Sequence, residues 1–218
     1  LTAATPLILT GLSVAIAFRA GLFNIGGEGQ LLIGGMTALV VGFSFSGLPW
    51  VVHLPLALLA GIIGGAAWGF VPGFLRARPG AHEVITTIML NYIAVLFVQF
   101  LLQTSFFQRE GRNDPVSKSV EATAELPQLL GWLNPAYRVN LGLIVALIAA
   151  AVINWLLFRT TLGFEFRAVG ANPAAARYGG ISVSRVYILV MIIAGALAGL
   201  AGAGQILGVL GRATPGFS

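Results

Sequence analysis

Uncharged stretches alternate with short polar segments along most of the chain. Four stretches contain no Asp, Glu, Lys or Arg: residues 29–75, 84–108, 139–158 and 186–211. A helix needs about 20 apolar residues to cross a bilayer. The first stretch is therefore long enough for two such helices, with a turn signal at residues 46–50, and each of the others holds one. Residues 5–18 are apolar but short, and they predict a partial or broken sixth span.

The composition agrees with this pattern. Hydrophobic residues make up 57% of the 218 residues and charged residues 9%, and the mean hydropathy is +0.92. Soluble domains are about a quarter charged. We therefore predict an all-α fold, a polytopic transmembrane helix bundle of about six spans in a single domain, residues 1–218. The chain has no Cys, which excludes a disulfide framework, and it begins without Met, so we expect a piece of a longer protein.

The charges predict an orientation. Residues 159–185 carry four Arg and one acid, and loops rich in Arg and Lys stay in the cytoplasm. Alternation of the spans then places residues 19–28 and 76–83 inside as well. It places residues 46–53 and 109–138 outside, and the second of these, an extracytoplasmic loop, carries four charges of each sign. The net charge of +5 is explained by this bias, so we expect no nucleic acid partner.

A short helix is predicted inside the basic segment 159–185. Asn172 is a suitable N-cap, Pro173 is suited to the first helical position, and Ala174 to Tyr178 can form about one and a half turns. Gly179 and Gly180 then end the helix. A short helix held at the membrane surface between two spans indicates a docking element.

Glycines recur at a spacing of four along two of the predicted helices. Small residues with this period allow helix backbones to approach closely in a membrane. The pattern favours packing within one subunit over a seam between two subunits. The glycines concerned are Gly61, Gly65, Gly69, Gly73, Gly195, Gly199, Gly204 and Gly208.

The polar segment 19–30 separates two apolar stretches. It contains four glycines together with Asn24, Glu28 and Gln30, a composition that disfavours a continuous helix. Broken helices at membrane depth often form binding sites in transporters. Asn24, Glu28 and Gln30 therefore either lie on a translocation path or belong to an ordinary cytoplasmic turn, and these residues leave both interpretations open.

Polar side chains also occur within the predicted spans. Asn91, Gln99 and Gln103 can share one helical face, which would suit a passage for an uncharged, hydroxylated solute. Hydrogen bonding between helices is the competing interpretation. We favour the lining role for Asn91 and the structural one for Gln103, and we interpret Asn154 and Gln205 as structural.

The sequence shows no catalytic chemistry. His53 is expected at a membrane interface beside Trp50, and His82 at a helix start, so the two histidines do not form a metal-ligand pattern. No Ser/His/Asp grouping and no phosphate-binding loop is apparent. We therefore expect no metal, no cofactor and no enzymatic activity, and energy for any active transport would come from another subunit.

Three segments together resemble a known family. They are GLFNIGGEGQLLIGG at residues 21–35, HEVITTIMLNYIA at residues 82–94 and RTTLGFEFRAVGANPAAARYGGI at residues 159–181. In this order and spacing they are similar to the permease subunits of bacterial ABC importers for nucleosides and simple sugars, of the branched-chain amino acid type. The resemblance covers essentially the whole chain and is greatest to the nucleoside branch.

The resemblance implies a larger permease, truncated here at both ends, in the bacterial plasma (inner) membrane. It implies an ABC ATPase subunit, a second permease subunit in a homo- or heterodimer, and an extracytoplasmic substrate-binding protein as partners, with ATP hydrolysed on the separate ATPase. The alternative is an ion-coupled secondary transporter of small polar solutes. That mechanism normally needs an ionisable group within the membrane, for which Glu28 is the one candidate in the sequence.

Residues 159–185 would then be the cytoplasmic coupling loop. Many ABC importers carry in this loop Glu-Ala-Ala, then three residues, then Gly; here Ala174 replaces the acid and Gly180 supplies the glycine. The residues expected to couple to the ATPase are Arg167, Gly170, Asn172, Pro173, Ala175, Ala176, Arg177, Tyr178 and Gly180. Those expected on the substrate pathway are Asn24, Glu28, Gln30, Asn91 and Gln99.

Overall fold

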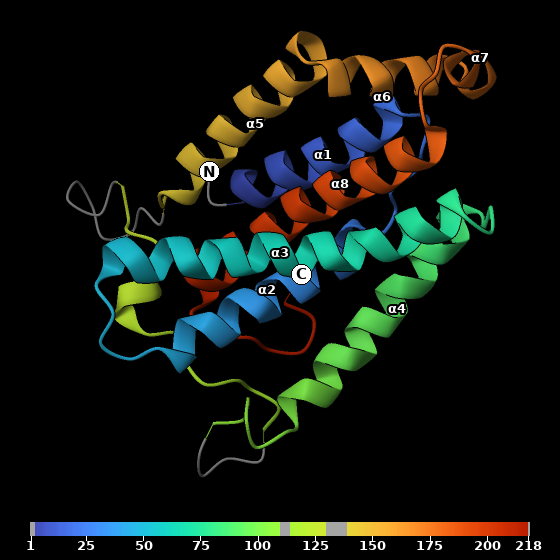
Figure 1. Ribbon diagram of the computed structural model, residues 1–218. Helices are drawn as coiled ribbons and strands as arrows, with labels where there is room; N and C mark the ends of the chain where they lie inside the picture. The colour runs from blue at the N-terminus through green and yellow to red at the C-terminus, as the bar shows by residue number, and fades with distance from the viewer. Residues whose placement is uncertain (1–2, 110–113, 130–138, 218) are drawn as a thin grey trace.

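Long helices account for most of the computed structural model, which describes residues 3–109, 114–129 and 139–217. Successive long helices run in opposite directions (Figure 1). They are α1 (Ala4–Arg19), α2 (Gly27–Ser44), α3 (Trp50–Ala77), α4 (Glu83–Leu102), α5 (Gly142–Arg159) and α8 (Val183–Gln205). The shorter elements are α6 (Thr161–Ala171), α7 (Pro173–Tyr178), a 3-10 helix at Ala122–Ala124 and a π-helix at Ile206–Leu210.

The all-α membrane bundle predicted from the sequence is confirmed. In the described part of the chain, four helices are long and apolar enough to cross a membrane: α3, α4, α5, and α8 together with the π-helix. Helix α1 is apolar but shorter than these four, in agreement with the partial span predicted at residues 5–18. Helix α2 begins within the polar segment 19–30. The prediction of about six spans thus corresponds to six long helices that alternate in direction. Four of them are both long enough and apolar enough to cross a membrane.

The centre of the bundle is the contact between α3 and α8. A Cβ atom added to Gly65 would overlap the carbonyl oxygen of Gly195, and one added to Gly69 would overlap that of Met191. Gly199 in turn lies against the backbone of Gly61 and Gly65. Such close backbone approach increases van der Waals contact where no hydrophobic drive exists between helices. The predicted packing within one chain is confirmed for these glycines.

The second glycine pair of α8 behaves differently. Nothing lies within 4 Å of the position of a Cβ atom on Gly204, and Gly208 lies against the side chain of Asn140. Their spacing of four therefore does not mark a close approach of two helix backbones.

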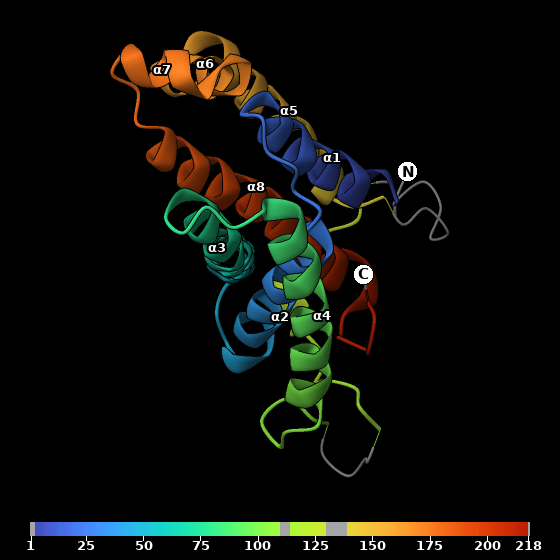
Figure 2. The ribbon, with the colours of Figure 1, turned by 90° about the vertical axis from the view of Figure 1, so that its right-hand side faces the viewer.

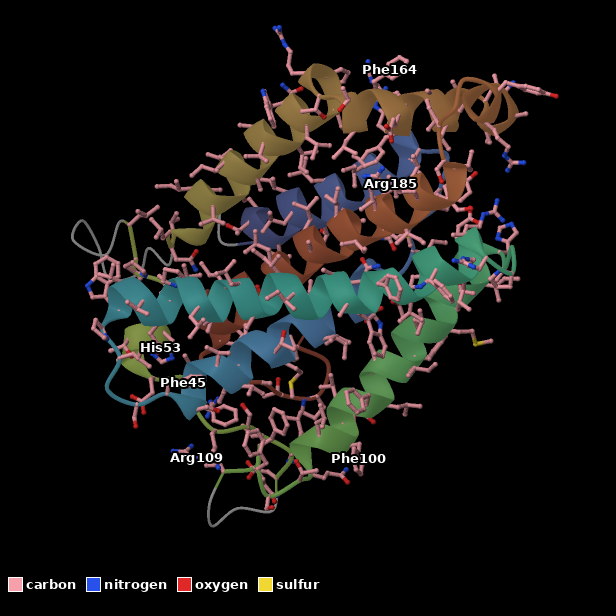
Figure 3. All side chains as sticks on the ribbon, in the orientation of Figure 1. Phe45, His53, Phe100, Arg109, Phe164 and Arg185 are labelled. Atoms are coloured by element: carbon pink, nitrogen blue, oxygen red, sulfur yellow. The ribbon has the colours of Figure 1, made fainter. Side chains whose placement is uncertain are left out.

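Helices α4 and α5 lie at opposite edges of the bundle (Figures 1 and 2). Their outward faces are apolar: on α4 Tyr92, Leu96 and Phe100 are exposed, and on α5 Leu147 and Trp155 are exposed. The side chain of Phe100 points away from the bundle in Figure 3. These faces are suited to lipid or to other apolar helices, since burying them requires no polar partner.

The loops gather at two ends of the bundle. The helices α6 and α7, the α1–α2 connection and the α3–α4 turn share one end, here called the inner end, and residues 114–129 lie at the other, the outer end (Figure 1). This grouping follows the predicted alternation. Of the predicted loop 109–138, residues 110–113 and 130–138 lie outside the described residues.

His53 lies in the first turn of α3. Its side chain is fully buried at the outer end, close to the 3-10 helix (Figure 3), and its predicted place at a membrane interface stays a prediction. Its Nδ1 lies 2.7 Å from Thr123 Oγ1 and its Nε2 lies 3.0 Å from the carbonyl oxygen of Val41. The ring is buried because residues 122–124 fold back over it, which no local pattern indicates.

Candidate functional site

The basic segment at the inner end contains two short helices rather than one. Thr160 caps α6, and its Oγ1 accepts a hydrogen bond of 3.1 Å from the backbone N–H of Gly163. Phe166 and Val169 of α6 are fully buried, whereas Phe164 is exposed (Figure 3). Sequence reasoning missed α6, although a Thr cap followed by this apolar spacing is a helix signal.

The structure confirms the second helix, α7, as predicted. Asn172 Oδ1 accepts hydrogen bonds from the N–H groups of Ala174 at 3.0 Å and Ala175 at 3.1 Å, so it is the N-cap. Pro173 occupies the first position. Gly180 follows the helix with a φ of +84°, a conformation that costs glycine little.

The side chains of α7 divide between two directions. Tyr178 is 96% exposed, and Pro173, Ala175 and Arg177 are also exposed. Ala176 instead is buried among apolar side chains of the core. The exposed surface at the end of α7 is therefore available for a partner, and Ala176 holds α7 against its own protein.

Arg167 is engaged within the chain. Its Nε donates a hydrogen bond of 3.3 Å to the carbonyl oxygen of Gly163, and its guanidinium carbon lies 5.3 Å from the ring centroid of Phe158. Arg19 lies over the same ring at 5.7 Å. Cation–π contacts of this length are attractive. Arg167 thus joins α6 to the end of α5, and Arg19 at the end of α1 contacts the same ring.

The α1–α2 connection, residues 20–26, is non-helical and buried in part. Asn24 Nδ2 donates to Gln30 Oε1 at 2.9 Å and to Ser13 Oγ at 3.1 Å, and Gln30 Nε2 donates to Asn24 Oδ1 at 3.1 Å. Asn24 and Gln30 are 3% and 1% exposed. Non-helical backbone at membrane depth requires such internal partners.

Asn91 of α4 holds the same connection from the other side. Its Nδ2 donates to the carbonyl oxygen of Ile25 at 2.9 Å, and its Oδ1 accepts from the N–H of Gly29 at 2.9 Å. The predicted residues Asn24, Gln30 and Asn91 therefore meet around one break between two helices.

Two further predicted residues lie apart from this network. Gln99 is two turns further along α4 and is exposed, and its place on a solute pathway stays a prediction. Glu28 is exposed at the start of α2, where it lines a cavity of about 460 Å³ with Asn24, Ile25 and Leu31.

One polar group near the break was not anticipated. Trp68 Nε1 is buried and has no hydrogen-bond partner among the described residues. A Cβ atom placed on Gly29 would lie 3.1 Å from this nitrogen and 2.9 Å from Asn91 Oδ1, so the indole N–H lies close to the Asn91 contact. A tryptophan in an apolar run carries no sequence signal for such a role.

The α3–α4 turn completes the inner end. Arg76 Nε lies 3.3 Å from Glu83 Oε2, and the Arg76 guanidinium carbon lies 5.7 Å from the ring centroid of Tyr187 on α8. Glu83 begins α4, as its position at a predicted helix start indicated. This pair joins α3, α4 and α8 at the same level as the break.

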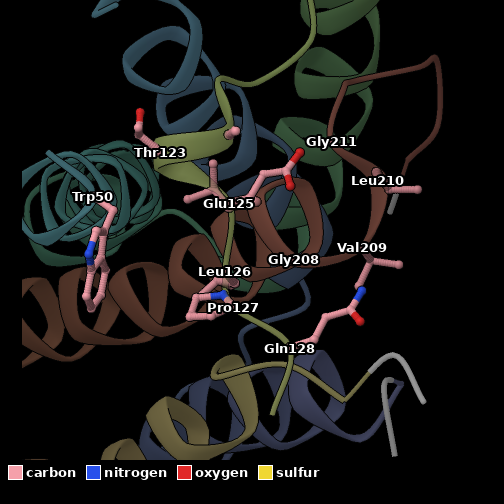
Figure 4. A pocket seen from close by; sticks show the side chains of 12 residues that line it. Trp50, Thr123, Glu125, Leu126, Pro127, Gln128, Gly208, Val209, Leu210 and Gly211 are labelled. Carbon is pink, nitrogen blue, oxygen red and sulfur yellow. The ribbon is translucent and has the colours of Figure 1, made fainter. Parts of the chain in front are cut away.

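The outer end contains a cavity of about 720 Å³ (Figure 4). Trp50 lies at one edge of it, and Gln128 lies at the opposite edge near Val209 of the π-helix, with Glu125 between them. The wall is fixed by backbone bonds, since Leu126 N–H donates to the carbonyl oxygen of Leu207 at 2.9 Å. Small-molecule sites commonly have about this volume.

Comparison with known proteins decides the family. The family described as "Branched-chain amino acid transport system / permease component" matches residues 1–217. The chain belongs to this family. Together with the apolar helices, membership makes the permease a multi-pass protein of the bacterial plasma (inner) membrane. No solved structure matches it.

Named relatives are themselves permease proteins. The chain is 46% identical over 204 residues to a guanosine ABC transporter permease protein of Bacillus subtilis, covering 94% of this chain and 58% of the relative. It is 43% identical to a nucleoside ABC transporter permease protein of Lactococcus lactis, covering 90% and 55% of the two chains. It is 39% identical to a glucose ABC transporter permease protein of Haloferax volcanii, covering 100% and 58%. The chain thus spans somewhat over half the length of these relatives.

Proposed function

We propose that the permease is the transmembrane subunit of an ATP-driven ABC importer for nucleosides or related simple sugars. The observation that carries this proposal is the 46% identity to a guanosine permease protein across 94% of the chain. On this proposal ATP is hydrolysed by a separate ATPase subunit. A second permease subunit and an extracytoplasmic substrate-binding protein complete the importer.

In this proposal the segment 159–185 is the cytoplasmic coupling loop, and residues 109–138 lie outside the membrane. The exposed end of α7 docks on the ATPase: Tyr178 supplies a large aromatic anchor, and Arg177 supplies a charge that can pair with acids. Asn172, Pro173 and Gly180 define the helix, and Ala175 adds apolar surface. ATP-driven closure of the ATPase pair then displaces α7 and α6, and the spans change between outward-facing and inward-facing states.

The solute path is proposed to pass the break between α1 and α2. The cavity beside this break is lined by Glu28, whose carboxylate can meet a hydroxylated solute, while Asn24 shapes the break through its own hydrogen bonds. The outer cavity, with Trp50, Glu125 and Gln128, is the proposed entrance, because aromatic rings and carboxylates suit sugar rings and their hydroxyl groups. Asn91 and Gln30 hold the break open between these helices through their hydrogen bonds.

Uptake in proteoliposomes tests the proposal. The permease is reconstituted with its partner permease, ATPase and binding protein, and entry of labelled guanosine is measured with and without ATP. We expect uptake that requires both ATP and the binding protein. Uptake that is independent of ATP and is abolished by collapsing an ion gradient would instead establish the ion-coupled secondary transporter. ATP-dependent uptake of glucose without uptake of guanosine would show that the substrate is a simple sugar and not a nucleoside.

A further inference from the structure

Two glycines meet where α6 crosses the α1–α2 connection. Gly21 has a φ of +74°, and a Cβ atom built on it would lie 3.4 Å from the Cα atom of Gly170. A Cβ atom on Gly170 would overlap the carbonyl oxygen of Arg19 and lie 2.9 Å from its carbonyl carbon. The two backbones are therefore in direct contact, with no side chain between them to absorb a displacement.

An aromatic ring contacts residues on both sides of the same crossing. Phe158, at the end of α5, has the guanidinium carbon of Arg19 5.7 Å and that of Arg167 5.3 Å from its ring centroid. The ring thus joins the last residue of α1 to the middle of α6. Cation–π contacts to one ring restrain both arginines without requiring a carboxylate.

The other side of the connection is attached to two spans. Asn24 and Gln30 exchange amide hydrogen bonds of 2.9 and 3.1 Å, which join residues 20–26 to α2. Asn91 joins them to α4 through the carbonyl oxygen of Ile25. The connection is therefore held between α6 on one side and α2 and α4 on the other.

We propose that Gly21, Gly170 and Phe158 form a rigid joint that transmits the displacement of α7 to residues 20–26, and through them to α2 and α4. The inference rests on the proposed function, in which α7 docks on an ATPase. Helix α7 packs on α6 more than on α8, so α6 is the main route by which a force applied to α7 reaches the α1–α2 connection. Helix α6 also touches α8, and transmission to α8 is the competing route.

Paired substitutions distinguish a loss of transmission through the joint from a general effect of disturbed packing. Gly170→Ala introduces a methyl group against the Arg19 backbone, and Phe158→Leu removes the ring but keeps an apolar side chain. The matched controls are Gly11→Ala, where nothing lies within 4 Å, and Phe164→Leu, an exposed ring on α6. In the reconstituted importer we expect solute uptake per ATP hydrolysed to fall roughly tenfold in the first two, a magnitude within the range of mutations along coupled networks. The controls should keep the wild-type ratio.

A distance measurement tests the joint without relying on activity. The chain has no Cys, so spin labels can be attached at introduced cysteines alone. Labels at Phe23 and Phe164, both exposed, report the distance across the joint; labels at Ile63 on α3 and Phe164 report movement of α6 against the core. We expect the Phe23–Phe164 distance to stay constant between nucleotide-free and ATP-bound importer while the Ile63–Phe164 distance changes.

The outcomes are distinguishable. A Phe23–Phe164 distance that changes with ATP as much as the Ile63–Phe164 distance would overturn the joint, and so would wild-type coupling in both Gly170→Ala and Phe158→Leu. In either case wild-type ATP-dependent uptake would leave the importer itself established. Absence of ATP-dependent uptake and of any distance change in the wild-type assembly would overturn the proposed function and the joint together.

Discussion

Each end of the bundle is held by an asparagine that makes two hydrogen bonds. At the inner end, Asn91 donates to the carbonyl oxygen of Ile25 and accepts from the N–H of Gly29. At the outer end, Asn140 donates to the carbonyl oxygen of Gly208 at 2.9 Å and accepts from the N–H of Gly142 at 3.1 Å. Each side chain thus donates to one backbone carbonyl oxygen and accepts from one backbone N–H, but the structures around the two side chains differ.

The outer end is a continuous network of backbone bonds. Ser117, Val120 and Leu126 donate their N–H groups to the carbonyl oxygens of residues 213, 211 and 207, and Glu121 donates to that of Gly42. The inner end has short capped helices that meet the spans through a few side chains and one glycine crossing. A network of many bonds resists local movement, whereas few contacts between rigid helices permit movement as bodies. The difference indicates that residues 114–129 and 207–213 move as one body, which we call the fixed outer end, whereas the inner end is jointed.

The largest expected effect follows from a charge at the exposed end of α7. In Tyr178→Asp we expect ATP-dependent uptake to fall at least about thirtyfold, because truncating an aromatic anchor at an interface costs about 2 kcal/mol or more. Tyr178 is 96% exposed, so folding of the spans should be unaffected. Uptake and thermal unfolding of the same preparation are the measurements.

Tyr178→Phe is the matched control, since it keeps the ring and should keep most of the uptake. Unchanged uptake in Tyr178→Asp would contradict the assignment of α7 as the docking helix. A lowered unfolding temperature would instead show that the side chain supports the fold.

The next effect distinguishes Asn91 from a polar residue elsewhere in the membrane. Asn91→Leu leaves the Gly29 N–H and the Ile25 carbonyl oxygen without their partner, at a cost of about 1–3 kcal/mol each. Asn154→Leu alters an exposed residue of α5. We expect uptake to fall roughly tenfold in Asn91→Leu and to change little in Asn154→Leu. Equal losses in the two variants would remove the reason for placing Asn91 at the moving junction.

The inner end was largely predictable because its signals are local. Asn172, Pro173 and Gly180 specify α7 through capping and turn preferences that involve only neighbouring residues. The glycine and amide content of residues 19–30 predicted the break, and the structure brings Asn24, Gln30 and Asn91 together there. Helix α6 was missed because the segment's charge favoured interpretation as a loop.

The outer end was not predictable in the same way. Bonds between residues 117–126 and 207–213 join segments about ninety positions apart, and backbone groups carry no sequence identity. The contact that buries His53 against Thr123 likewise joins positions far apart in the sequence, 70 residues from each other. Helical spacing indicated a face shared by Asn91 and Gln99, and of the two only Asn91 is shown to bond the connection.

Asn140→Leu is the counterpart of Asn91→Leu at the outer end. We expect a loss of stability of about 1–3 kcal/mol, since Gly142 N–H and the Gly208 carbonyl oxygen lose a buried partner. Solute uptake per ATP hydrolysed should stay at the wild-type value, because the outer end does not carry the displacement. Thermal unfolding and the coupling ratio, measured on the same sample, check both parts. A lowered ratio with unchanged stability would contradict the fixed outer end.

The smallest expected effect concerns the bond beneath residues 122–124. Thr123→Val keeps the shape of the side chain but removes the hydroxyl group that lies 2.7 Å from His53 Nδ1. The imidazole is fully buried and keeps its contact with the carbonyl oxygen of Val41, so one lost bond should cost about 1 kcal/mol. Thermal unfolding should detect this loss, and Thr123→Ser should restore most of it. If Thr123→Val instead lowered uptake per ATP, residues 122–124 would belong to the moving part, and the contrast between a jointed inner end and a fixed outer end would not hold.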